Sequence, residues 1–490
     1  MSDVIASRCS YIAGRWVEGE KSFPVTDPAS ETEVCVLSAA PLHEVRRAVT
    51  EARRSFDDGV WTDRPPRERA QVVRAFLDRL ESMRDELVAT LVAEAGQPVP
   101  FAETTQVEAG LTLARATVDL YLSLPEEEAT GVPVDELVRG RVAVSVRRHE
   151  PVGVVTAITP YNAALLMALH KVVPALLAGN SVVLRPSPLT PLSSLSLGVA
   201  AEDAGLPPGV LSVVIEDGPA GAELLTSHPG VDLVSFTGST AVGRRILAQA
   251  APTVKHVALE LGGKSAQIYL PDALHRVGPG AAAVVAMTSG QACSAATRML
   301  VPEERKEEVL ATVSAVYAGL PVGPPTAPGT MLGPVISDGQ RARCEEFVAL
   351  ALRHGGRVVT GGGRPAELER GYYVEPTVLD VPDNGNPAAR DEIFGPVLTV
   401  IGYRDLDDAV RIANDSPYGL SAQVHSADAA AATGLARRIR SGTVNVNTGL
   451  LSAYAPNGGY KQSGLGRERG AEGIRAFQEV KHMVIGELAR

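Results

Sequence analysis

Cysteine is scarce in this chain, with only four among 490 residues, and no two have the Cys-x-x-Cys spacing of a zinc or dithiol site. We therefore expect no metal site, and a reducing compartment suits the thiols. No run of about 18 apolar residues offers a membrane span, and residues 1–8 lack the apolar core of a signal peptide. These absences predict a cytoplasmic protein with no membrane partner.

Basic and aromatic residues are also few. Lys and Arg number 46 against 57 Asp and Glu, which gives a net charge of -11, and aromatic residues make up 4%. Because nucleic acid is not attracted to an acidic surface, we expect no nucleic-acid partner. A hydrophobic share of 45% and a charged share of 21% are typical of a folded globular protein. A chain of this length is expected to form two or three domains.

The periodicity of the chain changes at Gly153. Before it, three segments have apolar residues at the spacing of amphipathic helices: 42–61, 67–96 and 103–123. After it, helical segments alternate with apolar segments typical of buried parallel strands. These predicted strands are 154–158, 181–184, 211–215 and 233–236. This alternation predicts a doubly wound α/β unit that binds ligands at the carboxyl ends of its strands. A second α/β region is expected after Glu260, with strands near 265–270, 298–301, 358–360, 396–401 and 421–424.

A candidate nucleophile lies in a run of small residues between Gly290 and Arg298, where Cys293 is the single cysteine. Upstream, Glu260 begins the sequence Glu-Leu-Gly-Gly-Lys-Ser, and its glycine pair permits close backbone approach to a ligand. A thiol and a carboxylate in such contexts are a nucleophile and a base for covalent catalysis.

Cys293 and Glu260 occur in order with three further motifs, at residues 159–162, 236–240 and 392–396. With these motifs, the chain resembles the aldehyde dehydrogenase superfamily, in its NAD(P)-dependent hydrolytic type, over nearly its whole length. The resemblance implies a doubly wound parallel-sheet cofactor domain formed by residues 1–126 and 147–260. It also implies an α/β catalytic domain over 261–461 and a small β oligomerisation element formed by 127–146 and 478–490.

Residues 140–149 alternate as in a strand, with Val142, Val144 and Val146 on one side. An apolar strand face has to be covered. The resemblance implies that this strand and the C-terminal strand around 480–485 pair with another subunit, in a homodimer or homotetramer. An ordinary half-buried hairpin within one domain is the alternative.

The resemblance implies oxidation of an aldehyde to a carboxylic acid. The Cys293 thiolate would add to the aldehyde, hydride would pass to NAD or NADP, and water activated by Glu260 would hydrolyse the resulting thioester. The side-chain amide of Asn162 and the backbone N–H of Cys293 would donate hydrogen bonds to the oxyanion.

No Gly-x-Gly-x-x-Gly follows the first strand of the α/β unit. The resemblance instead implies that the pyrophosphate binds at a helix start near Ser239 and Val242, where free N–H groups favour phosphate. Glu392 and Phe394 match contacts to the nicotinamide ribose and ring. The residues expected at the cofactor are Ile158, Thr159, Pro160, Arg185, Ser187, Pro188, Gly218, Gly221, Phe236, Thr237, Gly238, Ser239, Val242, Leu261, Gly262, Glu392 and Phe394.

Arg185-Pro-Ser-Pro188 bears on the choice of cofactor. Many NAD-preferring relatives have Lys-Pro-Ser/Ala-Glu here, and their glutamate repels a 2′-phosphate. Pro188 removes that carboxylate, while Arg185 offers a fork of donors suited to phosphate. We therefore expect both NAD and NADP to be used.

Three positions depart from the family pattern. Family members often have aromatic residues along the substrate tunnel where this chain has Ala163, His170 and Asn457. We therefore expect larger or hydroxylated aldehydes to be the substrates. A solvent-capped helix residue is an equal interpretation of His170. A second glutamate that assists proton relay in some members falls at Ala471, with Glu472 one step away. Lys171 matches a family lysine that can assist orientation near the site, but a surface lysine is the safer interpretation, and its role stays open.

Two other enzyme classes were weighed. A cysteine thioesterase or hydrolase needs a histidine base near Cys293, and only His170 lies within a motif region. In a coenzyme A-acylating dehydrogenase, a water-activating Glu260 would destroy the thioester before it reached a thiol. A non-catalytic structural protein would not need Cys293.

Overall fold

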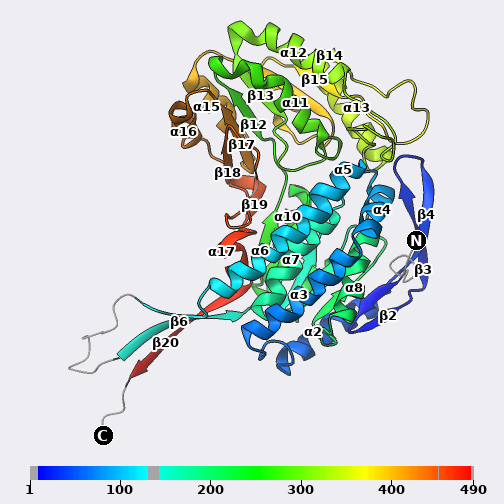
Figure 1. The fold of residues 1–490 in the computed structure, drawn as a ribbon, viewed down its shortest axis with the longest axis vertical. Coiled ribbons are helices and arrows are strands. Elements are labelled where there is room, and N and C mark those ends of the chain that lie inside the picture. The colour runs from blue at the N-terminus through cyan, green and yellow to red at the C-terminus, as the bar shows by residue number, and fades with distance from the viewer. Residues whose placement is uncertain (1–8, 131–142, 451, 487–490) are drawn as a thin grey trace.

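The computed structural model describes residues 9–130, 143–450 and 452–486. Two sheets lie in two lobes, each with helices packed against it, and a small sheet projects from the lower lobe (Figure 1). This arrangement confirms the predicted α/β class with two parallel-sheet units.

The lower lobe contains an eight-stranded sheet in the order β19-β11-β10-β7-β8-β9-β1-β2. Its five central strands are parallel: β7 (Val154–Ile158), β8 (Ser181–Arg185), β9 (Leu211–Val213), β10 (Leu233–Thr237) and β11 (His256–Glu260). Antiparallel strands lie at its edges: β1 (Ser10–Ile12), β2 (Arg15–Val17) and β19 (Gly464–Leu465). From β7 the sheet continues through β8 on one side and β10 on the other, so a topological switch point lies between β7 and β10.

Helices cover both faces of this sheet because successive strand residues point to opposite sides and both sides are apolar. Val155 and Ala157 of β7 belong to a core built mainly from helices α3, α4, α6, α7 and α8, whereas Val154 and Ile158 belong to one that includes α2. The helices are α2 (Leu42–Asp57), α3 (Pro66–Ser82), α4 (Arg84–Ala95), α5 (Val99–Phe101), α6 (Ala109–Ser123), α7 (Ala164–Ala178), α8 (Leu192–Asp203), α9 (Ala220–Ser227) and α10 (Thr240–Ala250).

Two predicted helices differ in detail from the structure. The segment 67–96 is divided between α3 and α4 at Met83, whose φ of -102° and ψ of 15° interrupt the helix. The segment 103–123 begins with the π-helical turn η1 (Ala102–Glu108) before α6. Neither break coincides with a glycine or proline, so the apolar periodicity continues through both and does not reveal them.

The upper lobe contains a seven-stranded sheet in the order β14-β15-β16-β13-β12-β17-β18, parallel except for β14. Its strands are β12 (Ala266–Tyr269), β13 (Arg298–Pro302), β14 (Arg357–Thr360), β15 (Thr377–Asp380), β16 (Val397–Tyr403), β17 (Ser421–His425) and β18 (Thr443–Val446). Its helices are α11 (Val277–Ala286), α12 (Lys306–Ala318), α13 (Asp338–Arg353), α14 (Pro387–Arg390), α15 (Leu406–Asn414) and α16 (Ala429–Ala436). The chain changes sheet between β11 and β12, and we propose the domain boundary at this point, between Glu260 and Leu261.

After β18 the chain returns to the lower lobe through β19 and α17 (Gly470–Arg475), which packs against α6 and α7. A three-stranded antiparallel sheet then projects from the body: β5 (Glu127–Ala129), β6 (Ala143–Pro151) and β20 (Gln478–Gly486). The strands β6 and β20, distant in the sequence, pair with each other, with Val144 opposite Ile485 and Val146 opposite Met483. Their pairing with another subunit stays a prediction. Val142 lies outside the described residues.

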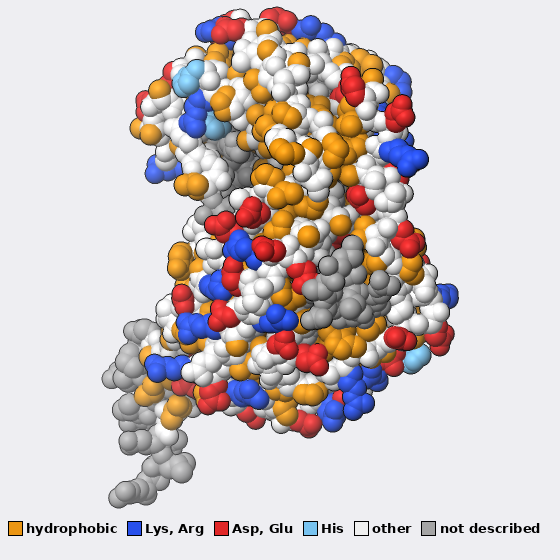
Figure 2. Space-filling model, turned by 45° about the vertical axis from the view of Figure 1, so that its right-hand side comes forward, with side chains coloured by type: hydrophobic (Ala, Val, Ile, Leu, Met, Phe, Trp, Pro, Cys, Tyr) orange, Lys and Arg blue, Asp and Glu red, His pale blue; other side chains and the backbone are white. Residues whose placement is uncertain are grey.

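The projecting sheet exposes hydrophobic side chains, which Figure 2 shows beside basic ones. Val144 is 43% exposed and Ile485, its cross-strand neighbour, is 57% exposed. An apolar pair of this size on a protruding sheet is typical of an interface.

We expect the protein to be a dimer or tetramer in solution, because association would cover this face. Light scattering at micromolar concentration measures the mass, and Ile485→Lys should shift it toward the monomer because a buried unpaired charge opposes association. As a control, Lys481→Met lies on the same strand and leaves the apolar pair intact. A wild-type monomer would instead support the intradomain hairpin.

Candidate active site

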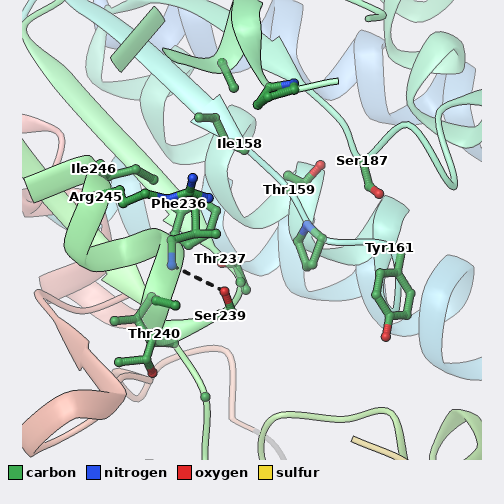
Figure 3. Close-up of a pocket in the computed structure, with 18 of the residues that line it drawn as sticks. Ile158, Thr159, Tyr161, Ser187, Phe236, Thr237, Ser239, Thr240, Arg245 and Ile246 are labelled. Atoms are coloured by element: carbon green, nitrogen blue, oxygen red, sulfur yellow. Dashed lines mark hydrogen bonds between the residues drawn. The ribbon is translucent and has the colours of Figure 1, made fainter. Parts of the chain in front are cut away.

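A cavity of about 870 Å³ lies at the carboxyl ends of β7 and β10, which is the switch point of the lower sheet. Figure 3 shows Thr159 and Tyr161, from the loop after β7, and Ser239 and Thr240, at the start of α10. Every residue predicted to contact the cofactor lines this cavity except Gly221. Asn162 and Cys293 line it too, so the nucleophile and the predicted cofactor residues share one space.

The part of the cavity beside α10 suits a phosphate-containing ligand. Ser239 caps this helix by accepting a hydrogen bond from the N–H of Val242 at 3.3 Å (Figure 3). A helix N-terminus offers free N–H groups and a positive dipole end. The Oγ1 atoms of Thr159 and Thr237 line the same cavity, are buried and have no hydrogen-bond partner within the described chain. Such unsatisfied groups are available to a bound ligand, so the residues fit a dinucleotide.

At the end nearer Cys293, Glu392 accepts a hydrogen bond from the N–H of Gly263 at 3.0 Å. A Cβ on Gly262 would lie 2.4 Å from Glu392 Oε2, so the carboxylate fits only because this position is glycine. Burial raises the pKa of Glu392 to about 7. Phe394 has a φ of 65°, unusual for a bulky residue, and meets Tyr161 edge to face with ring centroids 5.9 Å apart. The nicotinamide contacts expected of Glu392 and Phe394 stay a prediction.

At the opposite end of the cavity, the hydrogen bonds of Arg185 differ from the prediction. Its Nε donates to Glu216 Oε1 at 2.7 Å and its Nη2 donates to the carbonyl of Gly218 at 2.7 Å. The fork of donors expected to be free for phosphate is therefore already engaged. The N–H of Gly221 is not directed at the cavity either, since it donates to Glu216 Oε2 at 2.6 Å. Glu216 belongs to no motif in the sequence and was missed there.

The loop that carries Cys293 has a left-handed backbone turn just before the nucleophile. Thr288, Ser289 and Gly290 have φ angles of 44°, 55° and 74°. Ser289 Oγ donates to the carbonyl of Gly333 at 2.7 Å and helps to hold this turn. Such conformations cost free energy in residues other than glycine and are enriched at functional sites.

Asn162 connects this loop to the lower lobe. Its Nδ2 donates to the carbonyl of Gln291, two residues before Cys293, at 2.7 Å. Its own carbonyl accepts from Gln97 Nε2 at 2.7 Å and from Gln106 Nε2 at 3.1 Å. The two glutamines are buried and hold Asn162 in place. They lie far from the motifs, Gln97 in the link between α4 and α5 and Gln106 in η1, where no local sequence signal marks them.

The Cys293 thiol is neutral at ordinary pH. Burial, together with the negative charges of Glu392 and Glu260, raises its pKa to about 12. The nucleophile therefore needs a base. Glu260 is 6% exposed, and burial, aided by the negative charge of Glu468, raises its pKa to about 8, close to the value that suits a general base.

Glu468 is the second glutamate of this site, and two expectations are therefore wrong. The carboxylate beside Glu260 is not at Ala471 or Glu472, and Glu472 is exposed on α17. Lys171 is not a surface lysine. It is fully buried, and its Nζ lies 2.5 Å from Glu468 Oε1 and donates to Ser235 Oγ at 3.1 Å. A buried lysine needs such an acidic partner, and no local pattern identified it.

The three predicted substrate residues do not line the 870 Å³ cavity. Asn457 Nδ2 lies 3.5 Å from Glu260 Oε2, and the Asn457 backbone forms a bridge with that of Glu468. His170 has a buried Nε2 without a partner in the described chain, so the solvent-capped interpretation is wrong. Burial lowers the pKa of His170 to about 4, so the ring is uncharged. Ala163 precedes the first turn of α7, and substrate contact at these residues stays a prediction.

In residues 9–130, 143–450 and 452–486, no group of three or more His, Cys, Asp or Glu side chains is placed to hold a metal ion. No helix within those same ranges is long and apolar enough to cross a membrane.

A doubly wound sheet whose nucleotide-sized cavity reaches a half-buried cysteine is typical of a cofactor-dependent enzyme. A family model described as "Aldehyde dehydrogenase family" matches residues 16–483. The chain therefore belongs to the aldehyde dehydrogenase family, as the sequence motifs predicted. It is 39% identical to a 3-succinoylsemialdehyde-pyridine dehydrogenase of a Pseudomonas species over 96% of this chain and 97% of the relative. It is 38% identical to a geranial dehydrogenase of Castellaniella defragrans over 97% and 98% of the two chains.

Solved structures agree with the fold. Aldehyde dehydrogenase C of Pseudomonas syringae, a cysteine-to-alanine mutant in complex with NAD+ and octanal, matches with a TM-score of 0.93 and 38% identity over 99% of this chain and 98% of that one. Betaine aldehyde dehydrogenase of Staphylococcus aureus, in complex with NAD+, matches with a TM-score of 0.94 and 33% identity over 98% and 95%. The predicted fold is confirmed, and the cofactor is NAD or NADP.

The ion pair between Glu468 and Lys171 predicts a pH effect. Glu468→Gln removes a negative charge near Glu260, and this change favours ionised Glu260. The active base form would then persist to lower pH, and we expect the rise of kcat with pH to move down by about one unit. Steady-state rates between pH 6 and 9.5 measure this.

Glu472→Gln is the matched control, because it removes the same charge from an exposed site on α17. Its pH profile should coincide with that of the wild type. An unmoved profile in Glu468→Gln would mean that Glu468 does not act on the base.

Proposed function

We propose that this member of the family oxidises an aldehyde to a carboxylic acid through a covalent intermediate on Cys293, with hydrolysis by water that Glu260 activates. The observation that supports it most directly is the position of Cys293, at one end of a cavity that fits a dinucleotide. When bound, the nicotinamide supplies a hydride acceptor.

The first step needs a thiolate. The raised pKa of Cys293 means that its proton has to be taken up, and Glu260 is suitable because its own pKa is near 8. Sulfur addition to the carbonyl carbon gives a hemithioacetal. The Asn162 amide and the Cys293 N–H would donate to its oxygen, since the Asn162 NH2 group has a second N–H besides the one bonded to Gln291.

After hydride loss, the acyl group is held on Cys293 as a thioester. Once Glu260 has released the thiol proton to solvent, it accepts a proton from water, which attacks the thioester carbon. The C–S bond then breaks to give the acid, and the leaving thiolate takes up a proton to restore the thiol. Glu468 and Lys171 lie behind Glu260 and would stabilise its changes of charge. Asn457, at 3.5 Å from Glu260, helps to orient it.

The alternatives have less support. A cysteine hydrolase needs a histidine at the thiol, and no histidine hydrogen-bonds to Cys293 among the described residues, while His170 has a strongly lowered pKa. A coenzyme A-acylating enzyme would have no use for a buried base such as Glu260.

We infer that larger or hydroxylated aldehydes are the substrates, because Ala163 and Asn457 leave room and a polar amide near Glu260. The relatives' names mention geranial, octanal and 3-succinoylsemialdehyde-pyridine. These are larger than acetaldehyde, which supports the inference. The exposed apolar pair on the projecting sheet supports a homodimer or homotetramer, and the free thiols of Cys293 and Cys344 suit the cytoplasm.

Absorbance at 340 nm with an aldehyde panel tests the reaction, with and without coenzyme A. Oxidation should need no coenzyme A, and octanal should exceed acetaldehyde in kcat/KM. Cys293→Ala should lose about 10³-fold or more in rate yet still bind NAD, because the thiol is needed for chemistry and not for the dinucleotide. Turnover in that variant, or a requirement for coenzyme A, would contradict the mechanism. A preference for acetaldehyde would contradict the substrate inference alone.

Glu260→Gln should place the defect in hydrolysis of the thioester. If external base replaces Glu260 in the first step, rapid mixing should show a burst of reduced cofactor followed by a steady state about 10²-fold slower than in the wild type. Absence of the burst would place the role of Glu260 before hydride transfer. Glu472→Gln again serves as the control and should behave like the wild type.

A further inference from the structure

A buried ion pair lies at the end of the cavity away from Cys293. Arg185 ends β8, and Glu216 follows the neighbouring strand β9. Glu216 is 6% exposed and Arg185 is 9% exposed, and the Arg185 Nε donates to Glu216 Oε1 at 2.7 Å. Arg185 lines the cavity together with Ser187, Pro188 and Gly218.

Glu216 is held rigidly. Besides Arg185, it accepts from the N–H of Gly221 at 2.6 Å and from the N–H of Ala222 at 2.9 Å, at the start of α9. A Cβ on Gly221 would lie 2.1 Å from Glu216 Oε2, so a residue larger than glycine would displace the carboxylate. Its oxygens therefore have fixed donors and cannot readily turn away from Arg185.

The pair limits what Arg185 can offer to a ligand. A phosphate group is bound best by two parallel donors of a guanidinium. Here Nε is used by Glu216 and Nη2 by the Gly218 carbonyl, and only Nη1 has no partner in the described chain. A single N–H is enough for a ribose hydroxyl. Glu216 also neutralises the positive charge that would attract a 2′-phosphate.

We propose that Glu216 makes the enzyme favour NAD over NADP by engaging Arg185, so that this carboxylate disfavours the 2′-phosphate although Pro188 cannot. The proposal rests on the proposed function only in that the ligand is a nicotinamide dinucleotide. Four other charged residues line this cavity. Glu223, Arg245 and Arg343 are exposed, so solvent screens them, and Glu392 lies at the end nearer Cys293. Arg245 also lies on the opposite side of the cavity from Ser187 in Figure 3.

Calorimetric titration tests the proposal without any aldehyde. The probes are NAD and NADP, and also 5′-AMP and 2′,5′-ADP, which differ only by the 2′-phosphate. The wild type should bind NAD and 5′-AMP more tightly than their 2′-phosphorylated counterparts. Glu216→Gln keeps the shape of the side chain and removes its charge, and it should raise the affinity for NADP relative to NAD by about tenfold, the order expected for one charge-assisted contact. The ratio of kcat/KM values should follow.

Asp217→Asn is the matched control, because it removes the same charge from the adjacent exposed residue, which does not line the cavity. Its NADP to NAD ratio should stay within about twofold of the wild type. An equal shift in the control would reduce the effect to net charge and overturn the proposal. So would an unmoved ratio in Glu216→Gln, or tighter binding of 2′,5′-ADP than of 5′-AMP by the wild type.

The fragment comparison needs no variant, so the proposal can be tested even if Glu216→Gln does not fold. An enzyme that binds NAD selectively but oxidises no aldehyde would contradict the proposed function and leave this proposal standing.

Discussion

The hydrogen bond from Asn162 to the carbonyl of Gln291 is the contact on which the site depends. Asn162 follows β7 of the lower sheet, whereas Gln291 precedes Cys293 on a loop of the upper lobe, so this bond joins the two lobes where chemistry takes place. Gln97 and Gln106 hold Asn162 by donating to its carbonyl, and the left-handed turn at residues 288–290 sets the position of Gln291. A small displacement of either lobe would separate the oxyanion donors from the thiol, and such misplacement costs catalysis steeply.

Buried charge is the second constraint, and it is distributed in two separate places. Near Cys293, Glu260 and Glu468 repel one another and Lys171 compensates, which holds the pKa of Glu260 near 8. At the far end of the cavity, Arg185 and Glu216 neutralise one another and leave a surface suited to hydroxyl groups. Burying each pair costs desolvation free energy, which the hydrogen bonds around the pair help to offset. One adjusts a base, and the other limits which ligand can bind.

Most of the fold could be predicted because the apolar periodicity within each segment indicates a helix or a strand. The apolar segment at 154–158 and the helical segment at 42–61 have periodicities that the structure reproduces as β7 and α2. The motif residues also follow from local order, since the carboxyl ends of neighbouring parallel strands must meet at one edge. Thr159 and Thr237 therefore lie in one cavity, as expected. The break at Met83 could not be predicted, because neither a glycine nor a proline stands there.

The sequence by itself determined the family, the proposed nucleophile Cys293, the proposed base Glu260 and the loops that form the cavity, because each lies within a local motif. Only the tertiary structure decided which charged groups face one another. Glu468 and Lys171 are 297 positions apart in the sequence, and Glu216 and Arg185 are 31 positions apart. Neither partner has a local signature, and ionisation depends on burial and on neighbours within a few ångströms. For the same reason Lys171 was mistaken for a surface residue, and Arg185 for a free phosphate ligand.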